Sequence, residues 1–75
     1  MSRIIANPEI LAGKPIIKGT RISVELILQL FASGMSVDEI LAGYPTLKRE
    51  DIQAALEYTV KILRHKEPYA VANVV

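Results

Sequence analysis

The spacing of proline and glycine is the feature that most limits what this 75-residue chain can fold into. The first 22 residues contain two of each, at Pro8, Gly13, Pro15 and Gly19. A helix of ordinary length does not fit between residues that break helices and favour turns at such short intervals. The β-prone pairs Ile4-Ile5 and Ile16-Ile17 instead predict a short hairpin or an extended arm in this segment.

A first helix is predicted to begin after Ser23, where these interruptions stop. Serine is a good N-cap, and Ile22 and Ile27 flank it at the spacing of a hydrophobic staple. The following apolar residues fall on one helical face: Leu26, Ile27, Leu30 and Phe31. Gly34 then ends the helix, because glycine adopts the left-handed conformation that terminates many helices.

The same start signal returns at Ser36, which predicts a second, short helix. Glu39 lies three residues further on, so the two residues fit a capping box, and Met35 and Ile40 supply a second staple. Gly43 and Pro45 close this helix after about two turns.

A third and longer helix is predicted from about Lys48 to Arg64. Its apolar face consists of Ile52, Ala55, Leu56, Val60, Ile62 and Leu63. A polar stripe at four-residue spacing consists of Arg49, Gln53, Glu57 and Lys61. Glu50 and Asp51 suit the positive end of the helix dipole, and Pro68 prevents the helix from continuing.

These patterns predict one mainly α domain over residues 1–75: an extended or β N-terminal arm (1–22), a three-helix core (23–64) and a C-terminal tail (65–75). A chain of this length buries only roughly 60% of the surface that it exposes when unfolded. It has no cysteine for disulfides, yet 51% of its residues are hydrophobic and its mean hydropathy is +0.29. Small domains of this kind often gain stability by association, so we expect a homodimer or a tight complex with a partner.

The charge of the chain is unevenly distributed although its net value is only +1. Both ends are basic, whereas residues 25–59 contain six acidic side chains and two basic ones. This is not the uniform basic field of a strong nucleic-acid binder. The first residues do not resemble a signal peptide, and no apolar run is long enough to span a bilayer. We therefore expect a cytoplasmic protein without membrane contact.

Catalytic and metal-binding patterns are absent from the sequence. His65 is the only histidine, and without cysteines or clustered acids it has no companions for a metal site. No second base is available to activate Ser23, Ser33 or Ser36 as a nucleophile. The segment 13–21 contains glycines and lysines but not in the order of a phosphate-binding loop. We predict neither an enzyme nor a cofactor site.

The order of a helix, a short turn, a short helix, a loop and a long helix is typical of helix-turn-helix modules, whose last helix enters the major groove of DNA. The candidate DNA-binding residues at the start of the third helix are Thr46, Lys48, Arg49 and Gln53. Those in the arm are Lys14, Lys18 and Arg21. The alternative is a plain three-helix bundle with a solvated polar face. Glu50, Asp51 and Glu57 favour that alternative, because they repel phosphates.

Four segments between Asn7 and Tyr58 resemble the small bacterial and archaeal proteins of domain-of-unknown-function family 433. The segments are Asn7-Pro8-Glu9-Ile10 with Gly13-Lys14-Pro15, Ile17-Lys18-Gly19-Thr20-Arg21-Ile22, the run 33–41 with Tyr44-Pro45-Thr46-Leu47, and the run 50–58. One departure is Lys48, where the family often has a threonine or serine that would cap the third helix.

The resemblance implies a homeodomain-like or winged-helix-like helix-turn-helix fold and the role of a VapB-type antitoxin. Such a protein dimerises, binds its own operator DNA and blocks a PIN-like nuclease toxin. For this chain we expect the toxin to be held by the C-terminal end, through Arg64, Lys66, Tyr69, Val71 and Val74. The competing hypothesis is a protein-interaction and dimerisation module that never binds DNA.

Overall fold

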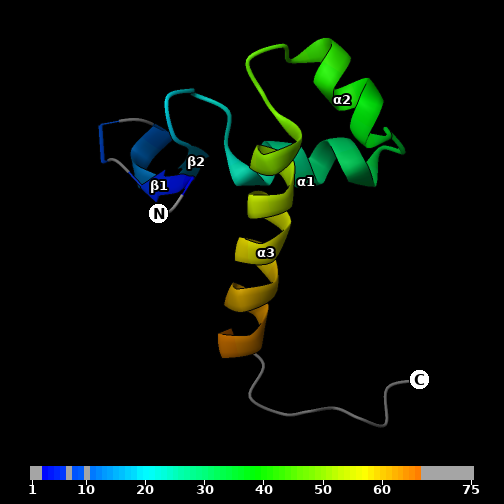
Figure 1. Cartoon of the computed structure of the whole chain (residues 1–75). Helices are drawn as coiled ribbons and strands as arrows, with labels where there is room; N and C mark the ends of the chain where they lie inside the picture. Colours follow the sequence, from blue (N-terminus) through cyan, green and yellow to red (C-terminus); the bar gives the residue numbers. More distant parts are fainter. Residues whose placement is uncertain (1–2, 7, 10, 67–75) are drawn as a thin grey trace, which may run out of the picture.

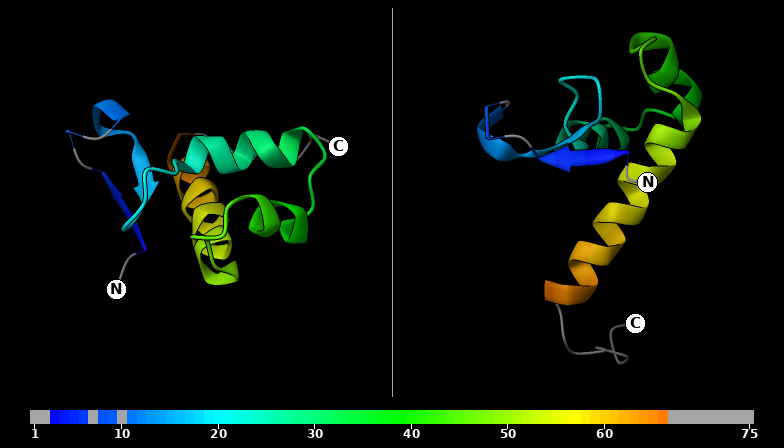
Figure 2. Two further views of the ribbon diagram at one scale, coloured as in Figure 1. Left: turned by 90° about the horizontal axis from the view of Figure 1, so that it is seen from above. Right: turned by 60° about the vertical axis from the view of Figure 1, so that its left-hand side comes forward.

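The computed structural model describes residues 3–6, 8–9 and 11–66 and is mainly helical. A two-stranded antiparallel sheet of β1 (Ile4–Ala6) and β2 (Pro15–Ile17) precedes three helices. These are α1 (Val24–Ala32), α2 (Val37–Gly43) and α3 (Arg49–Lys66). Helix α1 crosses α3 near the N-terminal end of α3, α2 lies on the far side of that crossing from the sheet, and α3 extends well beyond α1 (Figures 1 and 2).

The N-terminal segment forms the predicted hairpin, and the hairpin is part of the core. Ile4 pairs with Ile17 and Ile5 with Ile16, and the 3-10 turn Leu11–Gly13 lies between the strands. Ile16 and Ile17 are completely buried, and Ile17 belongs to the same apolar cluster as the helices. The hairpin thus supplies hydrophobic surface that the three short helices alone would lack.

Helix α1 begins and ends where the sequence predicts. The Ser23 hydroxyl accepts a hydrogen bond from the Leu26 amide at 2.9 Å, as an N-cap does. At the other end Gly34 has a φ of +100°, and its amide donates to the Phe31 carbonyl. The Met35 amide donates to the Leu30 carbonyl, which completes a Schellman motif.

Helix α2 begins with the predicted capping box. The Ser36 hydroxyl accepts from the Glu39 amide at 3.1 Å, and the Glu39 carboxylate accepts from the Ser36 amide at 2.7 Å. The box fixes where this seven-residue helix begins.

Helix α3 differs from the prediction at its C-terminal end. It continues through His65 and Lys66, two residues past the expected boundary at Arg64, so the tail segment is shorter than predicted. None of these three residues breaks a helix, and the predicted boundary rested only on Pro68 further along.

The core is one cluster of buried apolar side chains: Ile17, Val24, Ile27, Ile40, Leu47, Ile52 and Ala55. The predicted apolar face of the third helix is only partly correct, because Ile52 and Ala55 are buried whereas Leu56, Val60, Ile62 and Leu63 are 36–50% exposed. Two of the four, Ile62 and Leu63, border a groove that α1 also lines. Within the described residues no helix combines the length and apolar character needed to cross a membrane.

Candidate functional site

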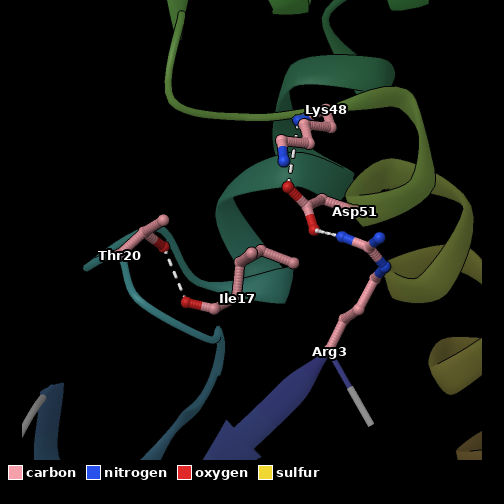
Figure 3. A network of polar contacts seen from close by, with 5 residues as sticks. All are labelled: Arg3, Ile17, Thr20, Lys48 and Asp51. Carbon is pink, nitrogen blue, oxygen red and sulfur yellow. Dashed lines mark hydrogen bonds and ion pairs between the residues drawn. The ribbon is translucent and has the colours of Figure 1, made fainter. Parts of the chain in front are cut away.

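Asp51 is a buried acid that joins the N-terminal strand to the start of α3 (Figure 3). Only 6% of this residue is exposed. Its Oδ1 accepts from the Arg3 guanidinium at 2.7 Å, and its Oδ2 accepts from the Lys48 amide at 2.9 Å. Lys48 cannot cap the helix with its own side chain, so Asp51 reaches back and satisfies the exposed amide.

Sequence reasoning missed this role of Asp51, which it assigned to the helix dipole and to repulsion of phosphates, and it gave Arg3 no role in a site. The three-residue spacing from Lys48 to Asp51 carried a usable signal, because an acid at this position can bond back to the capping residue. Nothing in the local sequence pointed to Arg3, which lies 48 residues away along the chain.

Arg3 also positions the turn between β2 and α1. Its carbonyl accepts from the Lys18 amide at 2.8 Å while its side chain holds Asp51. Within the turn, the Thr20 hydroxyl donates to the Ile17 carbonyl at 2.8 Å and accepts from the Ile22 amide at 3.0 Å. These hydrogen bonds link the turn 18–21 to the start of α3 through Arg3 and Asp51, and Figure 3 shows the Thr20 and Asp51 contacts.

This network connects two segments that carry four basic residues, which we call the basic end: Lys18, Arg21, Lys48 and Arg49. All four are exposed, and Thr46 is exposed in the loop just before α3. Among the described residues, Lys18, Arg21 and Lys48 make no ion pair, whereas Arg49 pairs with Asp38 of α2. The basic end therefore carries three cations that no carboxylate of the described residues pairs with.

The two remaining predicted DNA-binding residues are not part of the basic end. Lys14 pairs with Glu25 at 2.9 Å and lines a small apolar groove with Ile62 and Leu63 of α3. Gln53 lies one turn along α3 and donates to the Glu57 carboxylate at 3.1 Å. The arm is a folded hairpin, so Lys14 and Lys18 lie at opposite ends of β2.

The outer face of α3 carries mixed charge. Glu50, Gln53, Glu57 and Lys61 line a shallow depression between this helix and the N-terminal strand, together with Arg3. The carboxylates of Glu50 and Glu57 on this face would oppose phosphates, and Glu50 lies in the first turn of α3 beside Arg49.

The C-terminal half of α3 carries exposed apolar side chains. Leu56, Val60 and Leu63 are 36%, 50% and 50% exposed and follow one another at intervals of four and three residues. They form one stripe along the helix, which we call the α3 stripe. Ile62 lies on another side of the helix and lines the groove with Leu28 of α1, and Leu63 lies between the stripe and this groove.

Of the residues predicted to bind a partner, only Arg64 has a described side chain, and it is exposed near the end of α3. Lys66 is the last residue of the helix, but its side chain lies outside the described residues. The predicted contacts at Tyr69, Val71 and Val74 lie there as well.

Comparisons with known proteins agree on the family. Residues 4–59 match the family model described as protein of unknown function (DUF433). The chain is 36% identical over 55 residues to the uncharacterized protein y4eO of Sinorhizobium fredii, a match that covers 73% of this chain and 25% of that protein. The chain thus spans about a quarter of the length of that relative.

The fold is similar to the crystal structure of a DUF433 member protein from Anabaena variabilis. The TM-score is 0.75 at 31% sequence identity, and the match covers 91% of this chain and 62% of the other. A two-stranded hairpin packed on three helices is thus a form that this chain shares with a solved relative. By sequence and by fold, this chain belongs to the DUF433 family.

Proposed function

We propose that the chain is an antitoxin-like DNA-binding protein of a type II toxin–antitoxin pair, with α1, α2 and α3 as a helix-turn-helix unit. The observation that supports DNA binding is the basic end, where the linked turn 18–21 and start of α3 carry three cations that make no ion pair among the described residues. Lysine and arginine contacts to phosphates supply most of the non-specific affinity for DNA.

Arg49 is the residue of the basic end best suited to reading a base. It lies in the first turn of α3, the part of a recognition helix that faces base edges. Its pair with Asp38 joins two side chains that are 64% and 79% exposed. Exposed pairs of this kind contribute little free energy, so Arg49 can exchange Asp38 for a guanine or a phosphate at small cost.

The test of DNA binding is a gel shift with a duplex of the gene's own promoter region at several salt concentrations. Replacing Lys48 and Arg49 together with alanine should abolish the shifted band at moderate salt. Lys48→Ala alone should reduce the slope of log K against log salt by about one, because one phosphate contact is lost. Lys61→Ala is the matched control, since it removes a lysine from the same helix away from the basic end. Binding that is unchanged in the Lys48, Arg49 double variant would contradict the proposal.

The antitoxin role is tested separately, in cells that express a PIN-like nuclease encoded beside this gene. Co-expression of the full chain should restore growth. We expect the C-terminal end, with Arg64, Lys66 and the segment 69–75, to hold the nuclease, because a basic and apolar segment suits an acidic active site with apolar rims. Deleting residues 69–75 should release toxicity and leave the gel shift unchanged. Growth that is still restored by the truncated chain would contradict this assignment.

A second candidate is a protein-interaction module that does not bind DNA. The observation that favours it is the α3 stripe, together with Glu50 and Glu57 on the outer face of the same helix. The two candidates differ in retention on heparin or promoter DNA at low salt. An absence of retention there would favour the interaction module.

A further inference from the structure

The α3 stripe has the spacing of a coiled-coil seam. Leu56, Val60 and Leu63 alternate intervals of four and three residues, and all three are 36–50% exposed, although Leu63 also borders the groove beside α1. Such a stripe on a water-facing helix is typical of a surface that packs against another helix. Since α3 extends past α1, a second helix can reach the stripe without displacing the core (Figure 1).

The charges beside the stripe determine which helix fits and in which direction. Glu57 and Arg64 lie seven residues apart, so they occupy the same flank of the stripe, and both side chains are exposed. When two identical helices pack antiparallel, the same flanks face each other, and Glu57 of each copy meets Arg64 of the other. In a parallel pair this flank would face the opposite one, where Thr59 offers no charge.

We propose that two copies of this chain associate through the antiparallel packing of their α3 stripes, with Glu57 of each copy paired to Arg64 of the other. The two-fold axis then passes near Val60 and Lys61, midway between the two charged residues. Glu57 is already held by Gln53 at 3.1 Å, which orients its carboxylate along this flank.

This arrangement has a consequence for DNA that rests on the proposed function. Each Arg49 lies 11 to 12 residues from the two-fold axis, so the two basic ends are about 35 Å apart at a rise of 1.5 Å per residue. Half-sites of helix-turn-helix dimers are separated by one DNA turn, about 34–36 Å. The antiparallel dimer would therefore present its two basic ends at the spacing of adjacent major grooves.

The interface is tested by sedimentation equilibrium of the full chain without DNA. The unmodified protein should be a dimer, and Val60→Glu should raise its dissociation constant by about a hundredfold or more, because an unpaired charge is buried at the centre. Ala42→Glu is the control, since it adds the same charge at an exposed position of α2 and should leave the dimer intact. Circular dichroism checks that both variants retain their helices. A monomeric unmodified protein, or a Val60→Glu variant that dimerises normally, would overturn the proposal.

The direction of packing is tested with charge reversals and single cysteines. Glu57→Arg and Arg64→Glu should each weaken the dimer, and the two changes together should restore it. Under mild oxidation Val60→Cys should crosslink two copies. Leu56→Cys should not crosslink, because the two copies of residue 56 in the antiparallel dimer are separated by about 13 Å along the helix axis, beyond the reach of a disulfide. Equal crosslinking by both cysteines would show a parallel pair and contradict the proposal.

These measurements separate the interface from the proposed function. A stable antiparallel dimer that fails to bind promoter DNA would contradict only DNA binding. A monomer that binds promoter DNA would contradict only the interface.

Discussion

At the scale of single residues, Asp51 is the side chain on which most of the local order depends. It satisfies the Lys48 amide at the start of α3 and holds Arg3, whose carbonyl in turn fixes the Lys18 amide. One carboxylate therefore connects the strand, the basic turn and the last helix. It supplies the N3-to-N-cap half of a capping box, although Lys48 lacks the hydroxyl that would supply the other half.

Asp51→Ala should lower the free energy of unfolding by about 2 kcal/mol, because it leaves the Lys48 amide without its cap and Arg3 without its partner. Arg3→Ala should cost less than about 1 kcal/mol, since the Arg3 side chain is 45% exposed and its pair is partly solvated. Urea denaturation of both variants measures the difference. An Asp51→Ala variant no less stable than Arg3→Ala would contradict the capping role.

At the scale of elements, the helices begin and end through local contacts. Ser23 and Ser36 cap α1 and α2 with their hydroxyls, and Gly34 ends α1 with a left-handed backbone. Each contact joins residues no more than five apart, so each can be predicted from the sequence. Helix α2 depends most on its cap, because seven residues are too few to form a stable helix alone.

Ser36→Ala should lower the free energy of unfolding by about 1 kcal/mol, because the Glu39 amide loses its acceptor. Ser33→Ala is the matched control, because it also removes one serine hydroxyl, three residues earlier in the chain. The Ser33 hydroxyl donates to the Leu30 carbonyl on an exposed turn, so its loss should cost only a few tenths of a kcal/mol. Thermal unfolding of the two variants compares them directly, and equal melting temperatures would contradict the importance of the capping box.

At the scale of the whole molecule, the hairpin and the helices form one cooperative unit. Ile17 of β2 packs in the same cluster as Val24, Ile27, Ile40 and Ile52. A chain of this size has little stability to spare. A destabilising substitution in β2 is therefore expected to unfold the helices as well.

Ile17→Ala should lower the free energy of unfolding by about 3 kcal/mol, because it leaves a cavity in the shared core. The adjacent change Lys18→Ala should alter it by less than about 0.5 kcal/mol, since Lys18 is exposed and makes no ion pair among the described residues. The far-ultraviolet circular dichroism of this mainly helical protein comes chiefly from its helices. A lower melting temperature of this signal in Ile17→Ala would therefore demonstrate that the hairpin and the helices unfold together. A helix melt unchanged from that of the unaltered chain would mean that the hairpin folds separately.

The part of the candidate site that lies on α3 was predictable from the sequence, whereas the part that lies on the hairpin was not. Lys48 and Arg49 lie at the start of α3, as the capping and periodicity signals require. The grouping of Lys18 and Arg21 with them, and the separation of Lys14, depended on how the hairpin packs on the helices. No pattern within a few residues of Lys14 encodes its pair with Glu25 or its place beside Leu63.

The sequence by itself determined where α1 and α2 begin, where α1 ends and that the first 22 residues form a hairpin or an extended arm instead of a long helix, because these features rest on hydrogen bonds and backbone preferences between near neighbours. Only the tertiary structure decided that Arg3 meets Asp51 across 48 residues and that Leu56, Val60 and Leu63 remain exposed. A helical periodicity identifies an apolar face but not what covers it. Here the side of α3 with Ile52 and Ala55 packs in the core, whereas the side with Leu56, Val60 and Leu63 stays largely exposed.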